Sequence, residues 1–166
     1  MPRHTRARID LDALRSNFRT ARRLAPDSAS MAVVKADGYG HGLEPVARVM
    51  AQETDCLAVA TIDEAQRLRA SGITAAIVLL EGVHEAADWS VVSELGLQPV
   101  LHSPHQIAGS ETLDVASPVW IKCNTGMNRL GVEPRDVAAF RQRLGNQPGL
   151  RVVGLLSHYA CADDLS

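Results

Sequence analysis

The sequence predicts an α/β fold built on a parallel sheet, in the form of a partial (β/α)8 TIM-type barrel with about six of its eight strands. Six apolar runs recur along the 166 residues, and segments with helical periodicity lie between most of them. Most of the runs are continuous rather than alternating, which is typical of strands buried on both faces of a parallel sheet. Strands that alternate with helices are typical of α/β folds.

The apolar runs mark the expected strands. They are MAVVKA (31–36), CLAVA (56–60), AAIVLLE (75–81), QPVLH (98–102), PVWIKCN (118–124) and RVVGLLSHY (151–159). Polar side chains lie at or near the C-terminal ends of these runs, at Lys35, Glu81, His102, Lys122 and His158. Because the catalytic side chains of a barrel come from the C-terminal ends of several strands, this pattern favours a barrel over an open doubly wound sheet.

Local signals predict the helices between the strands. Apolar residues at helical spacing predict a helix over 11–21, with Asp10 as its N-cap, and a second over 43–50. Thr61 and Glu64 form a T-x-x-E capping box that predicts the start of a third.

Two later helices are expected to begin at a proline, one at Ser103-Pro104 and one at Glu133-Pro134. No helix is expected after the sixth run, and six strands are fewer than a closed barrel of this type needs. Two open sheet edges would be a liability for a free-standing domain. We therefore expect this chain to be a fragment of a longer protein.

The composition is that of a soluble globular protein. Apolar residues make up 46% and the formal net charge is -2, which argues against nucleic-acid binding through a basic face. No apolar run approaches the roughly 20 residues that span a bilayer, and the charged start without an apolar stretch is not expected to be a secretory signal. The cysteines, Cys56, Cys123 and Cys161, show no paired spacing, so we expect reduced core or half-buried thiols in a cytoplasmic protein. The histidines show no metal-ligand spacing.

The stretch AVVKADGYGHG, residues 32–42, places a lysine at the end of a buried strand and a glycine-rich turn after it. An amine buried against apolar residues loses hydration of its charged form, so its pKa falls and it becomes a nucleophile for aldehydes such as pyridoxal phosphate. The turn and the helix expected after it offer backbone amides to an anion. From the residues alone, a solvent-reaching lysine before an ordinary glycine turn is an open alternative.

Four ordered motifs carry a family resemblance: VVKADGYGHG (33–42), VLLEGV (78–83), WIKCNTGMNRLGV (120–132) and LLSHYACADD (155–164). With the opening ARIDLDALRSNF, they resemble the alanine racemase family over essentially the whole chain. The resemblance implies an eight-stranded N-terminal barrel that holds pyridoxal 5'-phosphate, a C-terminal β domain, and a homodimer with shared active sites. Residues 1–166 would then be an incomplete barrel domain, without the β domain.

The resemblance also implies roles for the cofactor-binding residues. Lys35 would hold the cofactor as a Schiff base and, once freed by substrate, act as one of two opposed acid/base groups. Tyr39 would contact the cofactor phosphate, Leu80 would line the cofactor pocket, and His158 would pack beside the pyridine ring.

Two cationic residues match further positions of the family. Arg129 would hydrogen-bond the phenolic oxygen of the cofactor and lie near the substrate carboxylate. Lys122 matches a lysine that the family often carries as a carbamate, an anion able to hold Arg129 in place. Asn124 departs from the pattern, since many relatives have an aspartate there.

The resemblance thus implies a cytoplasmic isomerase that interconverts L- and D-alanine by a two-base mechanism, for peptidoglycan supply or for alanine catabolism. The opposite base would be a tyrosine of the partner subunit's C-terminal domain, so this chain alone is expected to be poorly active. Two alternatives are a racemase of broader amino-acid specificity and a non-catalytic pyridoxal-phosphate-binding barrel. Neither a nucleic-acid nor a membrane partner is expected.

Overall fold

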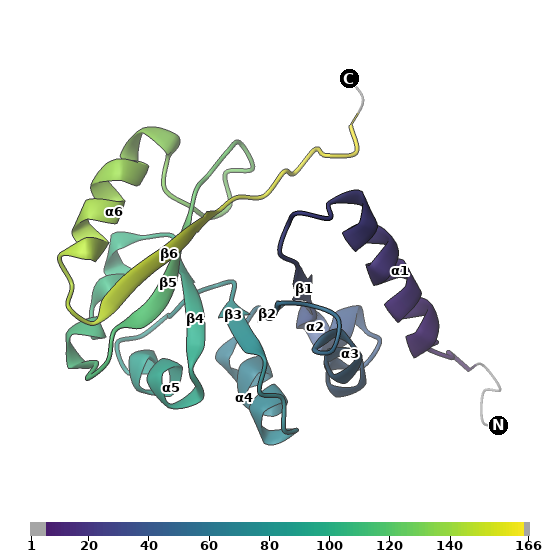
Figure 1. Ribbon diagram of the computed structural model, residues 1–166. Helices are drawn as coiled ribbons and strands as arrows, with labels where there is room; N and C mark the ends of the chain where they lie inside the picture. The colour runs from purple at the N-terminus through teal and green to yellow at the C-terminus, as the bar shows by residue number, and fades with distance from the viewer. Residues whose placement is uncertain (1–5, 165–166) are drawn as a thin grey trace, which may run out of the picture.

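The computed structural model describes residues 6–164 and confirms the six-stranded parallel sheet. The strands are β1 (Met31–Val33), β2 (Cys56–Val59), β3 (Ala76–Leu79), β4 (Leu97–Leu101), β5 (Ser117–Lys122) and β6 (Leu150–Leu156). They lie in the order β1-β2-β3-β4-β5-β6, so each strand pairs with the one before it (Figure 1). A doubly wound sheet reverses its strand order at a switch point, whereas this unreversed order is that of a barrel.

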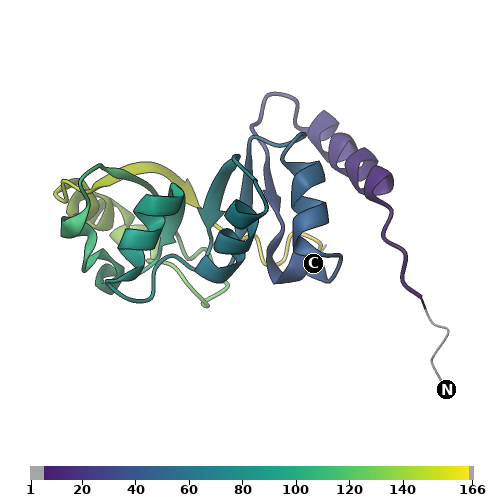
Figure 2. The same cartoon turned by 90° about the horizontal axis from the view of Figure 1, so that it is seen from below.

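Helices connect the strands. The α-helices are α1 (Leu11–Leu24), α2 (Lys35–Tyr39), α3 (Leu43–Met50), α4 (Ile62–Ala70), α5 (Asp88–Leu95) and α6 (Val137–Gly145), with 3-10 helices η1 (Pro104–Ile107), η2 (Ser110–Thr112) and η3 (Pro134–Asp136). α1 and α6 lie at opposite ends of the row of elements in both views (Figures 1 and 2). Among the described residues, no helix has the length and apolar character that crossing a bilayer requires.

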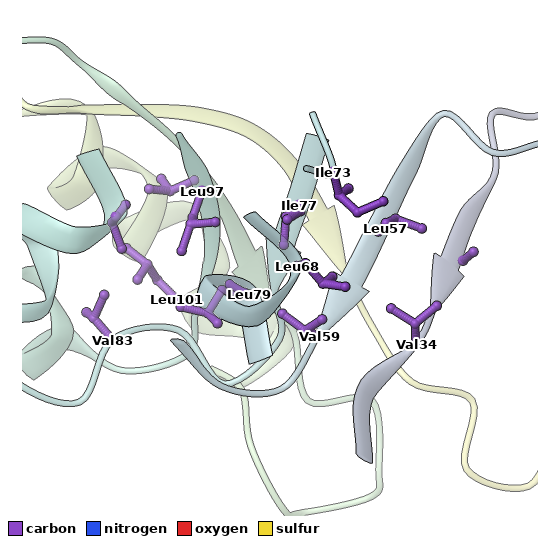
Figure 3. Packing of buried hydrophobic residues seen from close by; sticks show 14 of the residues in the cluster. Val34, Leu57, Val59, Leu68, Ile73, Ile77, Leu79, Val83, Leu97 and Leu101 are labelled. Carbon is purple, nitrogen blue, oxygen red and sulfur yellow. The ribbon is translucent and has the colours of Figure 1, made fainter. Parts of the chain in front are cut away.

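The central strands are buried on both faces, as their continuous apolar runs predict. On the helix side, Leu57, Ile77 and Leu97 are fully buried in a large cluster, whose side chains extend across the strands in Figure 3. On the other face, a smaller buried cluster takes one residue from each central strand: Ala58, Val78 and Val100. Each fully buried Leu or Ile stabilises the fold by about 1.5–3 kcal/mol.

Side-chain caps start two helices at the predicted positions. The Oδ1 atom of Asp10 accepts hydrogen bonds from the backbone N–H groups of Asp12 and Ala13, both at 3.0 Å, and so caps α1. Thr61 and Glu64 form the predicted capping box at the start of α4. Such caps satisfy backbone donors that a helix leaves without an internal partner.

Two elements differ from the expectation. Ser103-Pro104 opens only a four-residue 3-10 helix, and the hydroxyl of Ser103 makes no cap but lies 2.7 Å from Nδ1 of His105. No sequence signal marks the start of α5, since Ala87 precedes it without a side-chain cap. Its C-terminal end is marked by Gly96, which takes the left-handed conformation that favours glycine.

The three cysteines are free thiols, and the prediction that all of them are buried or half-buried is wrong for one. Cys123 is buried and Cys56 is half-buried, as predicted. Cys161 is exposed and lies in the segment beyond β6, outside the strands and helices of residues 6–164.

A bulge between β5 and β6 changes the face that β6 presents. Val152 lies opposite Val119, and both pack in the helix-side cluster. After the bulge, Gly154 lies opposite Trp120, and both Trp120 and Leu156 pack in the interior cluster. In a regular strand, side chains at even spacing, such as Val152 and Leu156, point to the same face of the sheet. One extra residue between them breaks this alternation, so the two side chains point to opposite faces. The indole of Trp120 occupies the space where Gly154 lacks a side chain.

We expect Gly154→Ala to lower the free energy of unfolding by about 1–3 kcal/mol, because the added Cβ would collide with the Trp120 ring. Urea unfolding followed by circular dichroism measures the change. Gly145→Ala is the matched control, since a Cβ there meets no atom within 4 Å. Equal stability of the two variants would contradict this packing.

Candidate functional site

A cavity of about 730 Å³ opens at the C-terminal ends of the strands. All six residues predicted as site residues line it: Lys35, Tyr39, Leu80, Lys122, Arg129 and His158. They come from four segments, which follow or end β1, β3, β5 and β6. The volume falls in the range of pockets for small organic ligands, roughly 300–1,000 Å³.

The chain turns sharply at Lys35, so the strand expected over 31–36 ends early. Ala36, Asp37 and Tyr39 have φ angles of 53°, 54° and 55°. This left-handed region is disfavoured for residues with a side chain, at a cost of roughly 1–2 kcal/mol each. The glycines of the motif predict a turn, but the left-handed run extends to three residues that are not glycine. Such strain is typical of functional sites.

Local hydrogen bonds support this left-handed turn. The N–H of Gly38 donates to the carbonyl of Val34 at 2.9 Å. The carboxylate of Asp37 accepts from the N–H of Leu43, the first residue of α3, at 3.0 Å. The turn places Tyr39 on the cavity wall with 59% of its surface exposed. A phenol in that position is available to a ligand rather than buried in the core.

The cavity gathers positive charge. Lys35 and Lys122 are the chain's two lysines, and both line it together with Arg129. Burial lowers the pKa of the Lys122 amine from its usual 10.5, and the positive charges of Arg129 and Lys35 lower it further. Lys35 is half-buried, and Arg129 is exposed at the cavity rim. These charges attract an anion, and the Lys122 amine loses its proton more readily than a free lysine does.

The loop that carries Arg129 is organised by the carboxamide of Asn124. Its Oδ1 atom accepts from the N–H groups of Gly126, at 3.2 Å, and Asn128, at 3.0 Å. Its Nδ2 atom donates to Oδ1 of Asn128 at 2.8 Å and to Oε1 of Glu133 at 2.9 Å. An aspartate could accept the first two bonds but could not donate the other two. The neutral amide is therefore matched to the Glu133 carboxylate beside it.

His158 lies exposed on the cavity wall after β6. Its neighbour Ser157 joins the segment after β6 to the segment after β5. The hydroxyl of Ser157 donates to the carbonyl of Cys123 at 3.2 Å and lies 2.5 Å from the hydroxyl of Thr125. These bonds fix the two segments that carry His158 and Arg129 relative to each other.

One wall of the cavity was not predicted as part of the site, although its residues follow β3 and β4. Gln106 is buried in this wall. Its Nε2 atom donates to the carbonyl of Glu81 at 3.2 Å and to the carbonyl of Val83 at 2.9 Å. Its Oε1 atom accepts from the N–H of His102 at 2.8 Å. Burial lowers the pKa of the His102 imidazole. Glu81 and His102 follow strands in the sequence, but no local pattern distinguishes Gln106. Within residues 6–164, no group of three His, Cys, Asp or Glu side chains is placed to hold a metal ion.

The family model described as "Alanine racemase, N-terminal domain" matches residues 9–166. The chain belongs to the alanine racemase family. The alanine racemase of Thioalkalivibrio sulfidiphilus is 48% identical over 168 residues, which cover 99% of this chain and 46% of that relative. The biosynthetic alanine racemase of Salmonella typhimurium is 46% identical over 159 residues, which cover 94% of this chain and 44% of that relative.

Solved alanine racemase structures share the fold. The biosynthetic enzyme from Pseudomonas aeruginosa aligns with a TM-score of 0.86 at 40% identity, over 93% of this chain and 44% of that one. The enzyme from E. faecalis aligns with a TM-score of 0.87 at 26% identity, over 95% of this chain and 44% of that one. The chain thus spans about half the length of the alanine racemases it matches, in their N-terminal part. The predictions of the family and of a partial barrel are confirmed.

We expect Asn124→Asp to destabilise the Arg129 loop by about 1 kcal/mol, because two donated bonds are lost and two carboxylates face each other. Hydrogen exchange across residues 124–133 measures the loosening. Glu133→Gln in the Asn124→Asp background should restore protection, since the new amide can donate to the new carboxylate. Glu133→Gln alone is the control and should have little effect. Failure of the double variant to recover would contradict the proposed pairing.

Arg129→Gln should raise the pKa of Lys122 toward 10.5 without reaching it, since one repelling charge is removed while burial remains. Competitive acetylation of Lys122 at a series of pH values, read by peptide mass spectrometry, measures the shift. Arg135→Gln, which removes an exposed cation on η3, serves as control. An unchanged Lys122 pKa in Arg129→Gln would show that the two charges do not interact.

Proposed function

We propose that this chain forms the cofactor-binding part of a pyridoxal-phosphate-dependent alanine racemase. The observation that carries the proposal is the placement of both lysines, Tyr39 and Arg129 around one cavity at the C-terminal ends of parallel strands. Enzymes with barrel folds place their active sites at this end. The names of the relatives support the reaction.

The residues present fit pyridoxal phosphate. The cavity offers amines to an aldehyde, three cations to a phosphate and a carboxylate, and the hydroxyl of Tyr39 as a hydrogen-bond donor. When bound, the cofactor supplies a conjugated ring that takes up the electrons left when the Cα proton departs. The left-handed turn after β1 places Tyr39 on the cavity wall, where its hydroxyl would reach the phosphate, and Leu80 supplies an apolar part of the wall.

Lys35 has two tasks in this proposal. Its amine would hold the cofactor through the aldehyde, and when free it would hold or release the substrate's Cα proton on one face. Racemisation needs a second acid/base group on the opposite face. We assign that group to the partner subunit of a homodimer, in a C-terminal β domain, as the resemblance to the family implies.

Three further side chains orient the reacting groups. Arg129 would bind the substrate carboxylate and the phenolic oxygen of the cofactor, tasks that suit a planar set of donors. Burial and the neighbouring cations lower the pKa of the Lys122 amine, so its neutral form is easier to reach; that form would bond to the carbon of CO2 and release a proton to solvent, giving a carbamate anion. That anion replaces a repulsion with an attraction and holds Arg129 in place. His158, on the cavity wall after β6, would pack beside the pyridine ring.

The biological role proposed for the whole protein is the supply of D-alanine for peptidoglycan in the cytoplasm. The biosynthetic relatives favour supply over catabolism. A racemase of broader amino-acid specificity is the second candidate, because the residues assigned to the site would contact the cofactor and the substrate carboxylate rather than the substrate side chain. Comparing the turnover of alanine, serine, lysine and arginine separates the two.

Lys35→Ala should abolish both the visible absorbance of lysine-bound pyridoxal phosphate and the racemisation of alanine by the protein as its gene encodes it. Borohydride reduction followed by peptide mass spectrometry identifies the lysine that carries the cofactor. Lys122→Ala is the matched control, since it removes the chain's other lysine and should leave the modified peptide at Lys35. Cofactor trapped on Lys122 in the unmodified sequence would refute the assignment.

A further inference from the structure

Glu64, in the first turn of α4, contacts the ends of two neighbouring strands. Its Oε2 atom accepts hydrogen bonds from the N–H groups of Ala60, at 2.7 Å, and Thr61, at 3.3 Å, directly after β2. Its Oε1 atom accepts from the N–H of Ala36 at 2.6 Å, directly after Lys35. One carboxylate therefore joins the residue that follows Lys35 to the adjacent strand end.

The bond to Ala36 acts at the point where the backbone leaves its ordinary conformation. Ala36 is the first residue of the left-handed turn, with a φ of 53° and a ψ of 52°. Because this conformation is disfavoured for alanine, it persists only when its surroundings hold it. A short bond to a carboxylate is stronger than one to a neutral acceptor. Releasing it would free the backbone next to Lys35 to relax, and the lysine would move with it.

A second contact from α4 reaches the next residue of the turn. Arg67 lies three positions after Glu64, on the same side of the helix. Its guanidinium lies 3.3 Å from the carboxylate of Asp37 and 2.9 Å from that of Glu44 on α3. α4 thus holds two consecutive residues of the turn, Ala36 and Asp37, through two of its own side chains.

We propose that Glu64 is a positioning residue for Lys35: through Ala36 it fixes the left-handed turn so that the lysine amine faces the cavity. This inference rests on the proposed function, in which Lys35 binds pyridoxal phosphate. Helix capping accounts for the Oε2 contacts of Glu64 but not for the contact of Oε1 with Ala36, 28 positions away in the sequence. The positioning role is therefore separable from the capping role.

Glu64→Gln tests the proposal in the protein as its gene encodes it. A carboxamide has one accepting oxygen in place of two, so it cannot satisfy both strand ends. Titration of the cofactor-free protein with pyridoxal phosphate, followed by visible absorbance and borohydride trapping at Lys35, should give roughly tenfold weaker binding or more. This readout does not depend on turnover.

Thr61→Ala is the matched control. It removes the other half of the same capping box, because the Thr61 hydroxyl accepts from the N–H of Glu64 at 3.4 Å, but it leaves the bond to Ala36 intact. Both variants should melt at a lower temperature than the unmodified protein. Only Glu64→Gln should weaken the binding of pyridoxal phosphate, whereas Thr61→Ala should keep it within about twofold.

Glu64→Asp is a second variant that tests the proposal if Glu64→Gln does not fold. It keeps a carboxylate in the first turn of α4, but its side chain is shorter by one methylene and cannot reach both strand ends. Weakened binding of pyridoxal phosphate in this variant supports the proposal, and unchanged binding overturns it. Equal binding by Glu64→Gln and Thr61→Ala also overturns it. If the unmodified protein forms no bond between Lys35 and pyridoxal phosphate, the proposed function fails first, and this inference fails with it.

Discussion

The parallel pairing of each strand with its predecessor determines the rest of this structure. Because all six strands run in the same direction, their C-terminal ends meet along one edge of the sheet. Residues as far apart in the sequence as Lys35 and His158 then line one cavity. The pairing is held by apolar side chains on both faces, which leaves the strand ends as the place where polar groups can gather. The site is thus a consequence of the sheet order.

Much of the fold could be predicted because the information is local. A strand buried on both faces needs a continuous apolar run, and each of the six runs became a strand. Two helix starts could be predicted because their capping side chains bond backbone groups within a few residues. These side chains belong to Asp10 for α1 and to Thr61 and Glu64 for α4. The positions of the site residues follow from the strand ends together with the family motifs. From the residues alone, the role of Lys35 is open between a cofactor amine and a lysine that reaches solvent.

The features that escaped prediction depend on contacts between distant residues. The handedness of the turn at Ala36 is supported by Glu64 from another strand–helix unit, and no local pattern encodes that contact. Gln106 organises a wall of the cavity through carbonyl groups on a neighbouring loop. Asn124 organises the Arg129 loop by donating to Glu133, nine positions further along the chain. Each case needs the three-dimensional structure, because the partners are brought together only by the fold.

The placement of both lysines has a practical consequence for work with this chain. The chain has no other lysine, and its remaining basic side chains are arginines and histidines. Reagents that couple to primary amines, such as succinimidyl esters, can therefore react only with the amines of Lys35 and Lys122 in the cavity and with the chain's α-amino group. A fluorophore attached in this way reports on the occupancy of the cavity, and immobilisation through amines risks blocking it. Attachment through the exposed thiol of Cys161 avoids both lysines.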